Sequence, residues 1–230
     1  MLARQAMYPA EVIVVDNGCN AADPAVPAGM PLTYQRAPVR CGAAQARNIG
    51  AAVATGQWLA FLDDDDTWCG DYLGAVQRAI NADPRPRLML GLAEFTNSRG
   101  RVEAVKRWDA SRPRTVLWRN PGVVGSNIII DCATFMATGG FDHRLACGED
   151  RALLWRCLRA DGLVSLLPEA CARIQRHDGE RLTDTRRLLK GKAHFAWLYR
   201  RDMRWRERLA TLGTLLISIG VALRRWDTSR

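Results

Sequence analysis

The sequence lacks the cysteine pattern that a disulfide framework or a structural zinc site would need. Its seven cysteines are an odd number, lie scattered along 230 residues and include no C-x-x-C pair. Disulfide-stapled secreted domains and standard zinc folds are therefore disfavoured, and a reducing cytoplasmic setting is favoured.

A long hydrophobic segment is also missing. No uncharged run exceeds 15 residues, the length of 209–223, whereas a helix that spans a bilayer needs about 20. The first residues, MLARQAMYPAE, contain no apolar signal core. Residues 209–223 are therefore better suited to lying on a membrane than to crossing one.

Sequence repeats and a glycine-rich, lysine-bearing phosphate loop near the start are absent too. The missing loop disfavours nucleotidyl transfer on an α/β sheet. What is present is an ordinary globular composition, with 48% hydrophobic and 25% charged residues.

The net charge of +9 is concentrated near the carboxyl end. Residues 1–172 hold 18 basic and 18 acidic side chains, whereas residues 173–230 hold 15 and 6. Together with the helical pattern of the last quarter, this asymmetry predicts an α/β domain over 1–183 and a basic amphipathic helical tail over 184–230.

The hydrophobic pattern of the first part alternates between strands and helices. The run 11–16 and the run 58–62 read as buried strands, while 43–55 and 71–81 have helical spacing. This order predicts an α/β unit with a parallel sheet. Further strands are expected at 87–94, 126–130 and 164–167, and a further helix at 150–160.

Four consecutive aspartates, Asp63 to Asp66, follow the second buried strand directly. Four adjacent carboxylates repel one another, and a divalent cation such as Mg²⁺ or Mn²⁺ would relieve that repulsion. The carboxyl end of a strand is also where open α/β sheets bind ligands. The alternative is a solvated acidic loop in which one aspartate caps the next helix.

Other polar positions give weaker signals. Asp16 and Asn17 end a strand and could bind a base or ribose, or simply form an Asx-turn. Arg47 could meet a diphosphate or be solvated. Asp150, with Glu149 beside it, could be a general base or could complement a helix dipole.

Taken in order, these segments resemble family 2 glycosyltransferases of the GT-A type. The resemblance implies a mixed, mainly parallel sheet flanked by helices, to which the basic helical tail would be added. The matching segments are VIVVDNG at 12–18, ARNIGAAVATGQWLAFLDDDD at 46–66, GGFD at 139–142, GEDRALLWRCLRADG at 148–162 and QRHDG at 175–179.

The resemblance also implies roles around a nucleotide-sugar donor. Asp63 and Asp65 match the family's D-x-D motif, with Asp65 as the direct ligand of Mn²⁺ or Mg²⁺. Asp64 would lie near the ribose, and Arg47 would help to bind the diphosphate. The bound ion would neutralise charge on the departing nucleoside diphosphate.

Further roles follow in the same way. Asp150, with Glu149 beside it, matches the family's E-D pair, in which the aspartate deprotonates the acceptor hydroxyl. His177 matches a position near the metal and the acceptor. Asp16 and Asn17 stand where the family has two aspartates that contact the base. Direct attack would invert the anomeric configuration.

The expected activity is therefore inverting, metal-dependent transfer of a sugar, most simply from a UDP-sugar, to a hydroxyl of a lipid-linked or polysaccharide glycan. The sequence departs from the family at Asn17 and at its start, because only LARQAMYP precedes the first strand and the usual first β-strand has no counterpart. These departures favour a second hypothesis, a truncated and non-catalytic binding or scaffolding module.

The tail suggests a separate property. Trp197, Trp205 and Trp226 are interleaved with arginines around the apolar run 209–223. This pattern suits an anionic membrane surface, and the uncharged run disfavours nucleic acid. A cytoplasmic protein bound peripherally to the inner face of the plasma membrane is expected. The alternative is a helix packed on the main domain.

Overall fold

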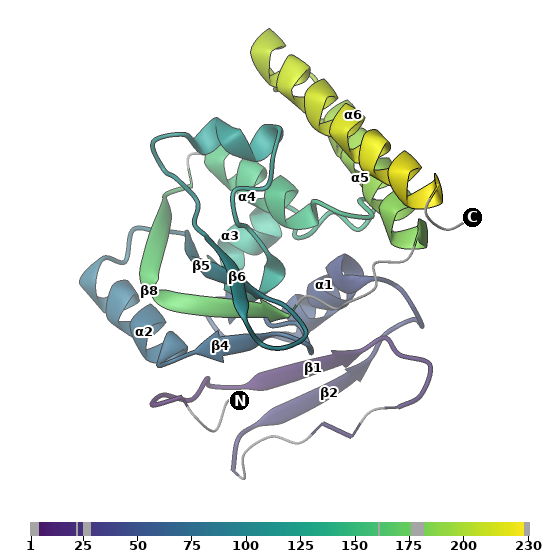
Figure 1. Cartoon of the computed structure of the whole chain (residues 1–230). Helices are drawn as coiled ribbons and strands as arrows, with labels where there is room; N and C mark the ends of the chain where they lie inside the picture. Colours follow the sequence, from purple (N-terminus) through teal and green to yellow (C-terminus); the bar gives the residue numbers. More distant parts are fainter. Residues whose placement is uncertain (1–4, 22, 25–28, 161, 176–181, 228–230) are drawn as a thin grey trace.

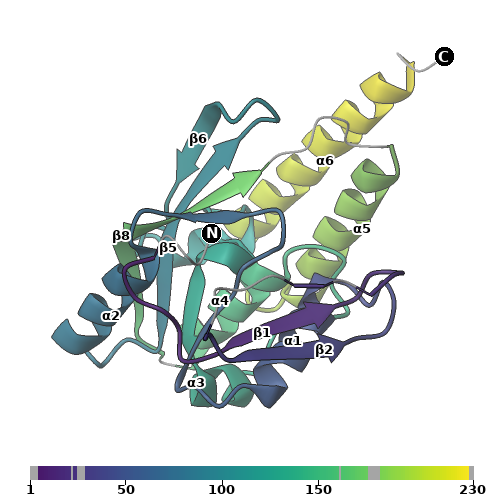
Figure 2. The same cartoon turned by 90° about the horizontal axis from the view of Figure 1, so that it is seen from below.

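The computed structural model describes residues 5–21, 23–24, 29–160, 162–175 and 182–227. They form two sheets with helices around them, and a pair of long helices extends from one side (Figure 1). The two helices lie side by side in both views (Figure 2).

The smaller sheet contains the first two strands. β1 (Val12–Asp16) pairs in parallel with β2 (Leu32–Arg36), and α1 (Ala43–Val53) packs against it. Gly50 permits this packing, because a Cβ there would lie 3.0 Å from Val15 Cγ2. In the described part of the chain, this pair is not hydrogen-bonded to the larger sheet.

The larger sheet has six strands and is mixed. The expected α/β architecture is confirmed, but strand direction differs from the expectation of a mainly parallel sheet: only β5 and β8 run parallel among its described pairs, and the other pairs are antiparallel. Its order is β3 (Trp58–Ala60), β7 (Ile128–Asp131), β5 (Leu88–Thr96), β8 (Val164–Gln175) and β4 (Thr67–Cys69), with β6 (Val102–Lys106) also on β5.

The central strands are buried on both faces. Ile128, Ile129 and Ile130 are all fully buried; the first and third contact one core cluster and the second contacts the other. A continuous apolar run indicates such two-sided burial, which is common in parallel sheets. It does not fix the direction of the strand, and this explains the difference from expectation.

Helices cover both faces. α2 (Tyr72–Ala82) packs on the face that includes Ile129. The opposite face contacts α3 (Cys132–Ala137) and α4 (Glu149–Arg159). The short 3₁₀ helices η2 (Pro113–Leu117) and η3 (Gly125–Asn127) connect these layers.

The carboxyl-terminal helices are joined to this core. α5 (Leu182–Leu198) and the turn before α6 (Trp205–Asp227) bury Phe195, Tyr199 and Met203 in the cluster beneath α4. In η2, the Arg114 guanidinium donates to both carboxylate oxygens of Glu207, each at 2.7 Å. Among the described residues, no helix combines the length and apolarity that crossing a bilayer requires.

The Arg114–Glu207 fork should stabilise the attachment of α6. Glu207→Gln removes the charge from a partly buried bidentate pair and should lower the free energy of unfolding by about 1–2 kcal/mol. Glu169→Gln, at an exposed position of β8, is the matched control and should change it by less than about 0.5 kcal/mol. Urea denaturation measures both; equal stabilities would show that the fork contributes nothing.

Candidate functional site

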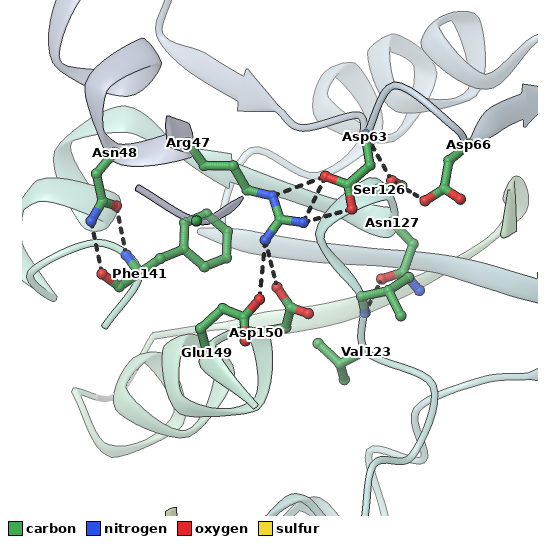
Figure 3. Close-up of polar contacts among 12 residues, drawn as sticks. Arg47, Asn48, Asp63, Asp66, Val123, Ser126, Asn127, Phe141, Glu149 and Asp150 are labelled. Atoms are coloured by element: carbon green, nitrogen blue, oxygen red, sulfur yellow. Dashed lines mark hydrogen bonds and ion pairs between the residues drawn. The ribbon is translucent and has the colours of Figure 1, made fainter. Parts of the chain in front are cut away.

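Four charged side chains from three separate segments meet beside the larger sheet (Figure 3). Arg47 of α1 donates to Asp63, which follows β3, at 2.6 and 2.7 Å. The same guanidinium lies 3.4 Å from Glu149 Oε1 and 3.4 Å from Asp150 Oδ1 at the start of α4. We call these four residues the Arg47 cluster.

The Arg47 side chain is held in place by its apolar surroundings and is only 10% exposed. Its guanidinium lies 5.1 Å from the centre of the Phe141 ring. Asn48 fixes that phenylalanine by exchanging two hydrogen bonds of 2.8 Å with its backbone. Gly125 faces the guanidinium, and a Cβ there would clash with it. The GGFD turn therefore positions the ring on which Arg47 rests.

The charges of the cluster strongly influence one another. Burial alone would lower the pKa of Arg47, but Asp150, Asp63 and Glu149 outweigh it and raise that pKa. Burial, with the charge of Glu149, raises the pKa of Asp150 well above its ordinary value, although Arg47 opposes the shift. A carboxyl group with a raised pKa is suited to accept a proton near neutral pH.

The four aspartates occupy very different environments. Asp63 is half-buried in the Arg47 cluster, whereas Asp64 and Asp65 are exposed. Asp66 is 7% exposed, accepts a 2.5 Å hydrogen bond from Ser126 Oγ and has its pKa raised to about 6 by burial. The run is therefore neither a wholly solvated loop nor a set of equivalent ligands.

Sequence reasoning missed Ser126 and Asp66 as the residues that shape this loop. Ser126 Oγ donates to Asp66 and accepts from the backbone N–H of Asp63 at 3.1 Å. Its carbonyl accepts from Trp68 Nε1 at 2.8 Å. A serine two residues before the buried run Ile128–Ile130 was the available signal, since a polar side chain there needs a buried partner.

Asp16 and Asn17 lie in the smaller sheet. Asp16 accepts from Arg36 at 2.6 Å, from Tyr34 Oη at 2.5 Å and from the backbone N–H of Gly18 at 2.8 Å. The last bond forms the Asx-turn that was the alternative to base binding. Their role toward a donor stays a prediction.

His177 falls outside the described residues, so its role is likewise untested. The described part of β8 ends at Gln175, whose backbone N–H lies 3.3 Å from Asp66 Oδ1. Gln175, the first residue of the QRHDG segment, thus contacts the loop 63–66, which we call the aspartate loop.

The aspartate loop offers part of the ligand set that a divalent cation needs. No group of three histidine, cysteine, aspartate or glutamate side chains is arranged to hold a metal within the described ranges. Mg²⁺ and its analogues are commonly held by one or two carboxylates plus substrate phosphates, so a complete protein cage is not required. Exposed Asp65, with Asp63 beside it, supplies oxygen donors of the right chemistry.

A family model described as Glycosyl transferase family 2 matches residues 2–137. The chain belongs to glycosyltransferase family 2. It is 31% identical over 173 residues to a pre-mycofactocin glycosyltransferase of Mycobacterium tuberculosis. That match covers 69% of this chain but only 36% of the relative, so the chain spans about a third of that protein's length.

Solved structures agree on the fold of this family 2 glycosyltransferase. A mannosyltransferase of Pyrobaculum calidifontis, in complex with GDP-Man and Mn²⁺, matches 99% of this chain and 69% of its own, with 18% identity and a TM-score of 0.61. Residues 1–349 of S. aureus TarS, in complex with UDP-GlcNAc, match 94% of this chain and 66% of their own, with 16% identity and a TM-score of 0.60. The expected GT-A fold is confirmed.

Removing the guanidinium should expose the repulsion within the cluster. Arg47→Met leaves three carboxylates without their cation and should lower the free energy of unfolding by about 3–5 kcal/mol. Arg47 opposes the rise in the pKa of Asp150, so without it that pKa would rise further in the folded state. The deficit should therefore grow as the pH rises from 5 to 8 and shrink on acidification.

Chemical denaturation at both pH values measures this effect. Arg99→Met, in the exposed loop between β5 and β6, is the control and should be nearly neutral at either pH. A deficit for Arg47→Met that is small, or equal at pH 5 and pH 8, would contradict the electrostatic role of Arg47.

Proposed function

We propose that this family 2 glycosyltransferase transfers a sugar from a nucleotide-sugar donor to a hydroxyl of an acceptor glycan. The observation that carries the proposal is the Arg47 cluster, which joins the aspartate loop to the first turn of α4. A general base can activate the acceptor hydroxyl for attack on the donor only if the base lies close to the loop that binds the donor.

The aspartate loop is proposed to bind the donor. Asp65 and Asp63 would hold Mn²⁺ or Mg²⁺, and the bound ion would neutralise charge on the leaving diphosphate. Asp64 is exposed and available to a ribose hydroxyl. Arg47 already lies beside Asp63, where a diphosphate held by the loop would meet its guanidinium.

The identity of the nucleobase in the donor remains a prediction. The structures that match this fold include one with GDP-Man and one with UDP-GlcNAc. We retain a UDP-sugar as the first candidate, with Asp16 and Asn17 as the residues proposed to contact its base.

Asp150 is proposed as the general base. Its carboxylate would accept the proton of the acceptor hydroxyl as that oxygen bonds to the anomeric carbon and the bond to the nucleoside diphosphate breaks. Direct displacement of this kind inverts the anomeric configuration. Glu149 supports the role, because its charge helps to raise the pKa of Asp150.

The two carboxylates should differ in what their removal abolishes. Asp150→Asn should keep the binding of donor and Mn²⁺ but slow transfer about a hundredfold or more, the scale of a lost general base. Asp65→Ala should instead abolish metal-dependent turnover while leaving the fold intact. Calorimetry and product assays separate the two effects.

Asp83→Asn, at the far end of α2, is the matched control and should transfer normally. Full activity of Asp65→Ala would contradict the proposed metal site. Loss of donor binding in Asp150→Asn would move Asp150 to donor binding. A wild-type chain that binds donor and acceptor without transfer would support the alternative, a binding or scaffolding module.

The outer face of α6 is proposed to contact the inner face of the plasma membrane, which would place the protein in the cytoplasm. Its apolar side chains point away from the core, and Leu216 and Ile217 are 67% and 69% exposed. Exposed Trp205 and Arg206 precede them. An amphipathic helix with tryptophan and arginine near its end is typical of interfacial binding. A lipid-linked glycan acceptor would fit this placement.

Polar substitutions on this face should weaken membrane binding. The double variant Leu212→Gln and Leu216→Gln removes two exposed leucines and should reduce sedimentation with phosphatidylglycerol vesicles about tenfold or more. The matched control is Val102→Gln with Val105→Gln, which alters exposed apolar residues of β6. Equal sedimentation of the two double variants would end the membrane proposal.

A further inference from the structure

A cavity of about 680 Å³ lies beside the Arg47 cluster, on the other side of the first turn of α4. Its walls come from the segment 106–121, the start of α4, and the facing sides of α5 and α6. Gly148 lines it and directly precedes Glu149 and Asp150. A ligand in this cavity would therefore lie next to the proposed general base.

A buried cation faces this cavity. Arg151 lines the cavity and is 8% exposed. Its Nε donates to the carbonyl of Val116 at 2.8 Å, and its guanidinium lies 4.1 Å from the centre of the Phe195 ring. Neither contact supplies a negative charge. Burial lowers the pKa of Arg151 to about 10, and among the described groups Cys147, not a carboxylate, opposes that shift.

A second cation lies in the same wall. Lys192 of α5 is half-buried and donates its Nζ to Ser218 Oγ at 2.7 Å, a neutral partner. Burial lowers the pKa of Lys192; Cys147 opposes that shift, and the neighbouring charge of Arg151 adds to it. Two neighbouring cations that are partly removed from water favour a ligand with more than one negative charge.

Most of the other charged side chains that line the cavity are also basic. Arg107, Arg112 and Arg119 also line it, and Asp109 is the single acid among its described lining residues. Asp109 already accepts from the hydroxyl and the backbone N–H of Ser111. The lining of the cavity is thus predominantly basic.

We propose that this cavity binds the phosphate group of a phosphorylated acceptor and so holds the acceptor beside Asp150. The inference rests on the proposed function, because it assumes that a donor occupies the aspartate loop. A phosphate carries enough charge to match Arg151 and Lys192 together, and arginine binds its oxygens in a fork. The volume accommodates a phosphate together with an attached sugar.

Direct titration tests the proposal. Calorimetry with decyl phosphate and with glucose 6-phosphate, each compared with decanol and glucose, measures whether the phosphate group is recognised. The titrations are made with Mn²⁺ and with whichever of UDP or GDP the chain binds, both saturating. We expect the phosphates to bind and the neutral compounds not to. Binding of decyl phosphate alone indicates a lipid-linked source, and binding of both indicates that a soluble phosphate suffices.

Variants on one helix assign the binding to the cavity. Lys192→Met should weaken phosphate binding about tenfold or more, as expected for a lost charge-assisted hydrogen bond. Lys192→Arg should restore it. Lys190→Met, two residues earlier on α5 and exposed, is the matched control and should change it less than about twofold. Nucleotide binding should be unchanged in all three.

Two results would overturn the inference. One is equal phosphate affinity in Lys192→Met and Lys190→Met. The other is loss of phosphate binding when nucleotide saturates the protein, which would place the anion in the donor site. Failure of UDP and GDP to bind would instead contradict the proposed function, and the phosphate titration without nucleotide would still decide whether the cavity binds anions.

Discussion

The site depends on one buried guanidinium that holds three carboxylates from distant parts of the chain. Arg47 contacts Asp63, Glu149 and Asp150, so α1, the loop after β3 and the start of α4 are fixed relative to one another. Burying an arginine in this way is unfavourable unless its charge is paired and its guanidinium is well packed. The Phe141 ring, the Asn48 bonds and the small Gly125 supply that packing.

In the aspartate loop, one buried carboxyl group fixes the position of its exposed neighbours. Asp66 accepts hydrogen bonds from Ser126 Oγ and from the backbone N–H at the end of β8. Ser126 Oγ in turn accepts a hydrogen bond from the backbone N–H of Asp63. This anchoring leaves Asp64 and Asp65 on the outside of the turn, where a ligand can reach them. Four adjacent identical residues thus include one buried anchor, Asp66, and two exposed carboxylates, Asp64 and Asp65.

Much of this arrangement could be predicted from the sequence. The apolar runs located β1, β3, β5, β7 and β8 but not β4 or β6. The order of motifs indicated the family, the fold and the expectation that Asp63 and Asp150 serve the same site. Strand direction could not be predicted, because the burial of Ile128–Ile130 is the same for either direction. The sequence also did not reveal that Asp66 is buried while Asp65 is exposed, since this difference depends on Ser126, which lies 60 positions after Asp66. Nor did α5 signal that Phe195 would enter the main core.

The first turn of α4 lies between the carboxylates of the Arg47 cluster and the basic residues of the cavity. Asp150 and Arg151 are consecutive, and successive side chains of a helix diverge by about 100°. The acidic side therefore faces Arg47 while the basic side faces the cavity lined by Lys192. Any rotation or fraying of this turn disturbs both at once. Because this turn is common to both sites, a substitution that is acceptable on one side of it must also preserve the geometry of the other side.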